Sequence, residues 1–522
     1  MLKMVDGTGI IGVDMVCPLG GTVSPPQPPN FDKVEVEGGG SLMLPNSLKA
    51  PLERVELIGN SVQGENPAPD NPQEIKSAGR KSKNLFNIAD LRVGQVQKDG
   101  TINEKSTYYR TAILDVPQDG KYRITFNSND DYIMLYFTEA YANGAYSQPY
   151  LRVHAGNPNY YITLAKGKNI LSFSTHTASE KIVFTTDHNI MIAAESETLG
   201  YEPYGYFFDL KITGKNLFDR EKARDTANWI IRDGDGYAKF PIRVGKGNEA
   251  TFSYTEKLTP GKGFYLGIAQ SDTGSAVGWL YHSTEINLNN NKFTVVAKGD
   301  CLYLSCNKTS IQKFFDTIQT LQVEIGSEQT EYEPYTEQTV QIALDEPLRG
   351  IGEYKDVLTK DGVVRKIAPY EVNLNDLRDG GYSKTNTVMF SVKVQNKTVG
   401  YASSKPSILC NILPDCALQM SNIYNNDKEC IAVGGGIVLF RVNKSRLKDI
   451  SSFEATKQSF IELMADKKMI VEYALETPVT EPLPESVQAQ LQALHSENGT
   501  THVFVDSGEV PCGIKLTYRK EK

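Results

Sequence analysis

The sequence predicts a mainly β, multidomain protein built from tandem antiparallel β-sandwiches of the jelly-roll type, with a short α+β region at its C-terminal end. Three observations lead to this prediction. The chain has 522 residues, more than a single hydrophobic core usually serves. It contains 27 Tyr, 20 Phe and 43 Gly, a composition that favours strands and turns over helices. A long internal repeat divides much of it into two similar parts.

Residues 1–80 are predicted to form an extended leader that attaches the protein to a partner. Stretches rich in Pro and Gly at 24–31, 37–46 and 64–73 interrupt it, and neither residue type suits the interior of a regular element. Alternating apolar and polar residues at 52–59 indicate a short strand. A flexible tail is the alternative, but the segment carries many apolar residues for a tail.

The repeat is marked by the word KNLF, which stands at Lys83–Phe86 and again at Lys215–Phe218. A second word, YEPY, follows each copy, at 201–204 and 332–335. A period of more than one hundred residues indicates two homologous domains, because solenoid repeats are much shorter. These domains are module 1 and module 2, and their predicted boundaries are 81–208 and 209–336.

Both modules show the alternation typical of antiparallel sandwiches, with Gly, Asn or Asp at the turns. In each KNLF word the Leu-Phe pair is expected to be buried at the opening of the sandwich. The proline of each YEPY word is expected to end the closing strand, because proline has no N–H to donate to a ladder. The repeated words are therefore interpreted as structural.

The remaining chain is divided into a connector at 337–366, a third β-rich module at 367–475 and a C-terminal α+β cap at 476–522. The connector contains TKDGVV, in which Asp361-Gly362 is typical of a hairpin with a type I′ turn. Two helices are expected, at 454–467 and at 485–496.

Composition argues against several classes of protein. The net charge of -8 is not gathered into a basic stripe, which argues against a nucleic-acid partner. No apolar run is long enough to span a bilayer and no secretory signal is recognisable, so we expect synthesis in a cytoplasm and no membrane partner. Seven cysteines without a CxxC pair argue against a disulfide framework or a zinc site and favour reduced thiols. No metal and no cofactor are expected.

The sequence offers little for catalysis. Six histidines are scattered without a recognisable catalytic motif, and no phosphate-binding GxxxxGK[ST] occurs. Adjacent acids such as Asp130-Asp131 are typical of solvated turns. A non-enzymatic protein is therefore expected.

Carbohydrate binding is the better hypothesis, because sugar sites combine flat aromatic faces with a few polar groups. In module 1 the stretch 139–161 is dense in tyrosine, and in module 2 the comparable stretch is 271–286. The alternative is that many of these rings are core or strand residues, since Tyr favours strands; Trp229 is assigned to the core. The candidate residues are Tyr146, Tyr150, Arg152, Asn157, Tyr160, Trp279, Tyr281 and His282.

Five phrases in this order resemble the tail and baseplate proteins of bacteriophages that infect Gram-positive bacteria, including minor tail and host-adsorption proteins. They are KNLF, the segment ending in YEPY, LRGIGEYKDVL, VEYALETPVTEPLP and LQALHSENGTTHVF. The resemblance covers about 45–520. It implies a component of a virion or of a phage-tail-like particle, with sandwiches like carbohydrate-binding modules.

The resemblance and the candidate residues together predict tail-tip assembly and attachment to a host cell-surface polysaccharide. The expected partners are other tail or baseplate proteins, held through the leader, and further copies of the chain, with a trimer favoured. Two alternatives stay open: an architectural spacer that binds no sugar, and a cell-wall or polysaccharide hydrolase with its site in the third module.

Overall fold

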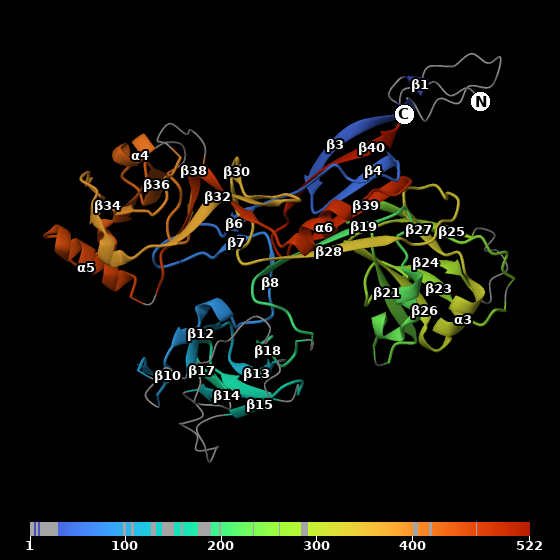
Figure 1. Cartoon of the computed structure of the whole chain (residues 1–522), viewed down its shortest axis with the longest axis horizontal. Coiled ribbons are helices and arrows are strands. Elements are labelled where there is room, and N and C mark those ends of the chain that lie inside the picture. The colour runs from blue at the N-terminus through green and yellow to red at the C-terminus, as the bar shows by residue number, and fades with distance from the viewer. Residues whose placement is uncertain are drawn as a thin grey trace.

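A computed structural model confirms the mainly β, multidomain class predicted from the sequence. Three lobes surround a long central sheet (Figure 1). The structure describes residues 30–97, 101–105, 109–126, 132–137, 151–157, 160–175, 189–197, 200–232, 234–259, 261–282, 291–399, 406–416, 420–465 and 467–522, together with the short pair β1 (Val5–Asp6) and β2 (Gly9–Ile10).

The central sheet has twelve strands from distant parts of the sequence. Residues 31–81, all but the last of which were predicted as part of the leader, contribute four of them. Helix α6 (Glu485–Ala493) covers one face, and its Leu491 shares a core with Leu210 and Leu516. The strand order is β28 (Glu337–Leu344), β19 (Tyr206–Thr213), β39 (Gly499–Asp506), β4 (Ser41–Ser47), β40 (Gly513–Glu521), β5 (Arg54–Ile58), β31 (Val357–Leu358), β32 (Gly362–Glu371), β38 (Ile470–Pro482) and β35 (Ile408–Cys410), with β3 (Phe31–Gly39) beside β40 and β8 (Arg80–Lys81) beside β19.

Each lobe is inserted between two neighbouring strands of the central sheet. Module 1 lies between β8 and β19, and module 2 lies between β19 and β28. The third module, at 372–469 and called module 3 from here on, lies between β32 and β38. The last residue before each insertion and the first residue after it are cross-strand partners. These pairs are Lys81 with Tyr206, Thr213 with Glu337, and Glu371 with Ile470.

Modules 1 and 2 are two-sheet sandwiches with the same strand order. In module 1 the five-stranded sheet is β15 (Leu151–His154), β14 (Tyr132–Phe137), β17 (Gly167–Thr175), β12 (Arg110–Val116) and β9 (Arg92–Val93), facing β16 (Tyr160–Leu164), β13 (Gly120–Thr125) and β18 (Met191–Ala194). In module 2 the five-stranded sheet is β24 (Ala276–Tyr281), β23 (Leu266–Ala269), β26 (Cys301–Asn307), β21 (Tyr237–Arg243) and β20 (Ile230–Ile231). It faces the three-stranded sheet of β25 (Lys292–Val296), β22 (Glu249–Ser253) and β27 (Gln322–Ile325).

Short elements complete these modules. Phe86 and Phe218 of the two KNLF words are buried as expected, and so is Trp229. The short elements are η1 (Ile88–Asp90), β10 (Gln95–Val96) and β11 (Ile102–Asn103) in module 1, and α2 (Arg220–Arg224), η3 (Thr226–Asn228), η4 (Lys308–Ser310) and α3 (Ile311–Thr317) in module 2.

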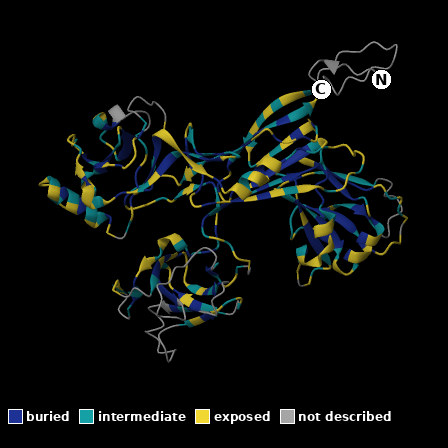
Figure 2. Ribbon diagram, viewed as in Figure 1, coloured by how far each residue is buried: buried dark blue, intermediate teal, exposed yellow. Residues whose placement is uncertain are grey.

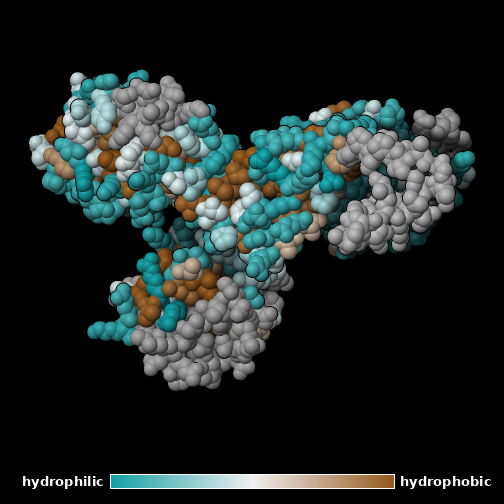
Figure 3. Space-filling view, turned by 45° about the horizontal axis from the view of Figure 1, so that its top comes forward, coloured by the Kyte–Doolittle hydropathy of each residue, from teal (hydrophilic) through white to brown (hydrophobic). Residues whose placement is uncertain are grey.

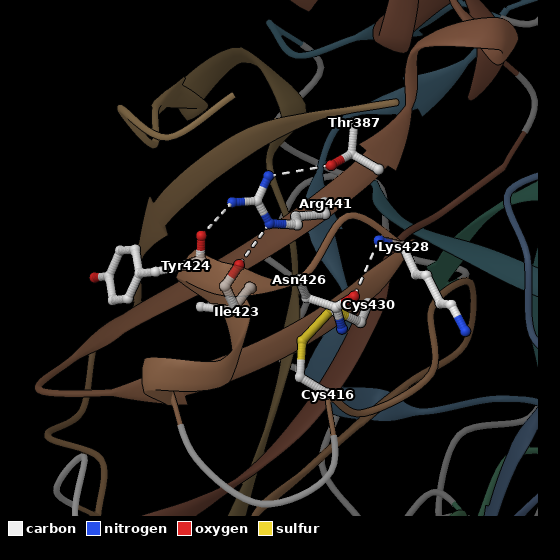
Figure 4. Close-up of a disulfide and its surroundings, with 8 residues drawn as sticks. All are labelled: Thr387, Cys416, Ile423, Tyr424, Asn426, Lys428, Cys430 and Arg441. Carbon is white, nitrogen blue, oxygen red and sulfur yellow. Dashed lines mark hydrogen bonds between the residues drawn. A yellow bond between two sulfur atoms is a disulfide. The ribbon is translucent and has the colours of Figure 1, made fainter. Parts of the chain in front are cut away.

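Module 3 combines a four-stranded sheet with two helices. The buried guanidinium of Arg441 donates to the Ile423 and Tyr424 carbonyls at the end of α4, at 2.5 and 3.3 Å (Figure 4). Beside it Cys416 and Cys430 form a disulfide, so the expectation of reduced thiols is wrong for this pair. The elements are η5 (Leu374–Asp376), β33 (Arg378–Asp379), β34 (Thr387–Lys393), β37 (Ile437–Asn443), β36 (Cys430–Gly434), α4 (Met420–Asn425), η6 (Lys444–Arg446) and α5 (Phe453–Leu463).

The two predicted helices are present as α5 and α6, each a few residues shorter than expected. The predicted hairpin joins β31 to β32, but its turn differs. Gly362 has no positive φ, and it opens β32 close to the Glu481 carbonyl. The type I′ turn at Asp361-Gly362 is therefore wrong, because the glycine is needed for close strand approach.

Buried residues fill the interior of each lobe and line the central sheet (Figure 2). Apolar side chains also gather near the middle of the face drawn in Figure 3. Within the described ranges, no helix is long and apolar enough to cross a membrane. The small pairs β6 (Ser61–Gln63) with β7 (Ile75–Ser77) and β29 (Gly350–Ile351) with β30 (Tyr354–Lys355) complete the fold.

Candidate functional site

Four aromatic rings cluster on the outer face of the five-stranded sheet of module 2. Trp279 lies at the centre, with its ring centroid 6.0 Å from Tyr237, 5.9 Å from Tyr265 and 5.3 Å from His282. The rings of Tyr265 and His282 are 4.5 Å apart. All four side chains are partly exposed. We refer to this cluster as the aromatic face.

Strand alternation places these rings outward. In β21 Ala238 and Phe240 enter the core, so Tyr237 and Lys239 project from the opposite side. In β23 Gly267 pairs with Trp279, and a Cβ at this glycine would lie 3.0 Å from a Trp279 ring carbon. The missing side chain therefore gives the indole a place to lie over the sheet.

A buried lysine lies under the aromatic face. Lys239 is only 4% exposed, and its ammonium group donates to the Ser305 hydroxyl and to the Gly274 carbonyl, both at 3.0 Å. Burial lowers the pKa of Lys239. Close by, Arg232 forms an ion pair with Asp272 at 2.5 Å. The face thus combines stacked rings with fixed polar groups.

This combination suits the recognition of a sugar ring. The apolar side of a pyranose can lie on an indole or phenol ring, while hydroxyl groups need donors and acceptors around the edge. Within the described residues, no group of three or more His, Cys, Asp and Glu side chains is placed to hold a metal ion. The rings and polar groups of the face supply aromatic stacking, hydrogen bonding and charge.

Two of the three candidates in module 2, Trp279 and His282, belong to the aromatic face. Tyr281 does not, and its assignment to a surface site is wrong. Its ring is 5% exposed and stacks on Phe264 with centroids 4.6 Å apart. Its hydroxyl donates to the Thr259 carbonyl and accepts the Lys262 N–H, each at 3.0 Å. A β-bulge in β24 turns this residue into the core.

The described candidates in module 1 are spread over both sheets. Arg152 is exposed on β15, at the edge of the five-stranded sheet, and Asn157 follows in a turn where its N–H donates to the His154 carbonyl at 3.3 Å. Tyr160 opens β16 in the other sheet, with its ring 6.2 Å from that of His154. Two further candidates, Tyr146 and Tyr150, lie outside the described residues.

Sequence reasoning missed three members of this site: Tyr237, Tyr265 and Lys239. The alternation of residues in YAKFPIR could have predicted part of this, because it places Tyr237 and Lys239 on the face of the strand opposite Phe240. The sequence could not predict that these residues lie near Trp279, because their proximity depends on the pairing of β23 with both β24 and β26.

No protein-family model matches this chain, and no curated protein matches it. Among solved structures, the chain was aligned with the "Structure of infectious bursal disease virus Gt strain". That alignment covers 97% of this chain and 85% of the other at 7% identity, with a TM-score of 0.09. A likeness this weak carries no argument about fold or function.

Proposed function

We propose that this chain is a non-enzymatic structural component of a phage tail or baseplate, or of a phage-tail-like particle, that helps to assemble the tail tip and attaches it to a host cell-surface glycan. The aromatic face is the observation that carries the glycan-binding part of this proposal. The phrases shared with tail and baseplate proteins support the assignment to a virion. Partner tail proteins and other copies of the chain, with a trimer favoured, belong to the same proposal.

Attachment through such a site works by multivalency. A partly exposed cluster of rings gives weak binding to each sugar unit, and linking several sites raises the overall affinity by roughly 10² to 10⁴. Assembly into an oligomer would supply the copies.

Replacement of Trp279 by alanine tests the proposal. Binding of the full chain to cell-wall polysaccharide from Gram-positive bacteria should weaken at least tenfold, because truncating a central aromatic contact costs roughly 2 kcal/mol. The measurement is retention on immobilised polysaccharide, supported by a change in Trp279 emission in the unsubstituted protein. Val277→Ala changes an exposed apolar residue of the same strand and serves as the control.

The alternatives predict different results. An architectural spacer would give no binding to any polysaccharide or glycan array, which would contradict the adhesive part of the proposal. A hydrolase would shorten the polysaccharide during incubation, which would contradict its non-enzymatic part.

One acid within the predicted third module, Glu472 of β38, bears on the hydrolase alternative. Burial raises the pKa of Glu472, but its carboxylate already accepts from the Arg349 guanidinium and the Ser61 hydroxyl, both at 3.0 Å, and from the Ser77 hydroxyl at 3.4 Å. A glycosidase acid instead faces a second carboxyl across a sugar. These contacts favour a structural ion pair.

A further inference from the structure

A separate pocket of about 260 Å³ lies where module 2 meets the central sheet. Lys211 and Thr213 of β19 and Phe504 of β39 line it from the sheet. Lys222 of α2 and Arg243 of β21 line it from module 2. Because both parts contribute walls, the pocket exists only when module 2 sits on the sheet.

The sheet side of the pocket carries a buried hydroxyl that has no partner. Thr213 is 1% exposed, and its Oγ1 makes no hydrogen bond within the described structure. Its cross-strand neighbour His502 is also buried, with an unpartnered Nε2. Buried polar groups are nearly always hydrogen-bonded, so an unpartnered hydroxyl in a pocket wall indicates a position where a ligand atom can bind.

The charge around the pocket favours an anion. Arg243 and Lys222 are exposed, and neither forms an ion pair in the described part of the chain. Lys211 is paired with Glu337. The acid that lines the pocket, Asp219, is engaged as the cap of α2, where it accepts the Lys222 N–H at 2.9 Å. Neither Arg243 nor Lys222 is therefore engaged in a salt bridge among the described residues, although the charge of Lys222 helps to lower the pKa of Glu337.

Aromatic rings lie beside two of the cations that line the pocket, Arg243 and Lys211. The Arg243 guanidinium lies over the Phe504 ring at 5.5 Å from its centroid, and the Lys211 ammonium lies over the Tyr335 ring at 5.4 Å. A planar guanidinium fixed on a ring can present two donors to one oxyanion. The ring surfaces that remain suit the apolar side of a sugar.

We propose that this pocket binds an acidic sugar unit through its oxyanion, a carboxylate or a phosphate, with Arg243 and Lys222 facing the charge and Thr213 donating its hydroxyl. The inference does not rest on the function proposed for the aromatic face, because it uses different residues and a different ligand group. It adds a second subsite at the base of module 2.

Titration of the full chain with monosaccharides, followed by ligand-observed NMR at low salt, tests this assignment. The probes are glucuronate, glucose 1-phosphate, neutral glucose and inorganic phosphate. At least one acidic sugar should bind about tenfold or more tightly than glucose, because charge-assisted hydrogen bonds exceed neutral ones. Added salt should weaken that binding.

Two variants and a control identify the pocket. Arg243→Gln should weaken the acidic sugar about tenfold, and Thr213→Val should weaken it several-fold while keeping the shape of the residue. Thr213→Val should leave the melting temperature unchanged or higher, since it removes an unpartnered hydroxyl. Arg224→Gln removes an exposed positive charge from α2 outside the pocket and should have little effect.

Three results would overturn the proposal. Acidic sugars could bind no better than glucose, or Arg243→Gln and Arg224→Gln could have equal effects. Alternatively, inorganic phosphate could bind while neither glucuronate nor glucose 1-phosphate binds. The pocket would then be a simple ion site and not a glycan subsite. Selectivity between glucuronate and glucose 1-phosphate would identify which oxyanion the pocket accepts.

Discussion

The asparagine of each KNLF word joins the two ends of its sandwich. In module 2 the buried Asn216 accepts the N–H groups of Phe218 and Val323 at 3.0 and 3.1 Å. Asn84 makes the same pair of bonds in module 1, to Phe86 and Ile192 at 2.9 and 3.0 Å. The asparagine of the repeated word thus supplies a buried side-chain amide, whose oxygen accepts hydrogen bonds from two backbone N–H groups far apart in sequence.

Replacing Asn216 by alanine should destabilise module 2 alone. Two buried N–H groups would lose their acceptor, at a cost of about 2–4 kcal/mol, or roughly 10 °C in melting temperature for a module of this size. Tryptophan emission measures this selectively, because both tryptophans of the chain lie in module 2. Asn84→Ala is the matched control. An equal shift of the tryptophan transition by both variants would contradict the argument.

Residue patterns predicted some of the aromatic face and missed the rest for a physical reason. Composition pointed to Trp279 and His282, since aromatic residues near turns are typical of binding surfaces. Tyr281 was misplaced because a one-residue bulge reverses the side of a strand on which a residue lies. Lys239 was missed because its burial beside the aromatic face depends on the pairing of distant strands.

Among the elements, the phrase LRGIGEYKDVL forms a crossing point of the central sheet. Gly350 passes so close to Gly59 that a Cβ on either glycine would lie within 2.5 Å of a carbonyl oxygen of the other segment. Next to the crossing, the fully buried Asp356 accepts the N–H groups of Arg349, Lys366 and Ile367 at 2.7–3.1 Å. Glycine and a buried carboxylate therefore fix this connection.

A Gly350→Ala substitution should destabilise the central sheet. The new methyl group would press on the Gly59 carbonyl, and overpacking of this kind costs about 1–3 kcal/mol. Gly39→Ala is the matched control, because no atom lies within 4 Å of its Cβ position and its φ is not positive. Differential scanning calorimetry of the two variants measures the difference. Equal stability of the two would show that the crossing relaxes without cost.

At the level of elements, sequence reasoning was most successful where the signal is local. Helices α5 and α6 follow from helical spacing and capping, as with Ser452, which accepts the Ala455 N–H at 3.1 Å. Strands β3, β4 and β5 were expected within a leader, because each segment alone is short and bounded by Pro and Gly. All three pair with β40, which lies more than 400 residues away.

On the scale of the whole molecule, the duplicated modules differ where a ligand could bind. In module 1 the outer-face pair Thr111 and Ser172 is covered by the β10–β11 hairpin, and the N–H of the fully buried Val96 donates to Ser172 at 2.6 Å. The corresponding outer-face pair in module 2 is Lys239 and Ser305, beside the aromatic face. In module 1 the β10–β11 hairpin covers this face, whereas in module 2 the face carries partly exposed aromatic rings.

The insertion of modules between paired strands predicts that module 2 can be removed without loss of the central sheet. Thr213 and Glu337 are cross-strand partners, so replacing residues 214–336 by Asn-Gly leaves β19 and β28 joined by a two-residue hairpin turn. Phe504 packs into the core of module 2 and would become exposed, so the shortened chain should carry Phe504→Thr as well. Circular dichroism and calorimetry should show a folded protein that has lost polysaccharide binding.

Removal of 476–522 instead takes away β39 and β40 and should abolish folding, because four other strands pair with these two. An unfolded product from the first deletion would show that the sheet depends on module 2.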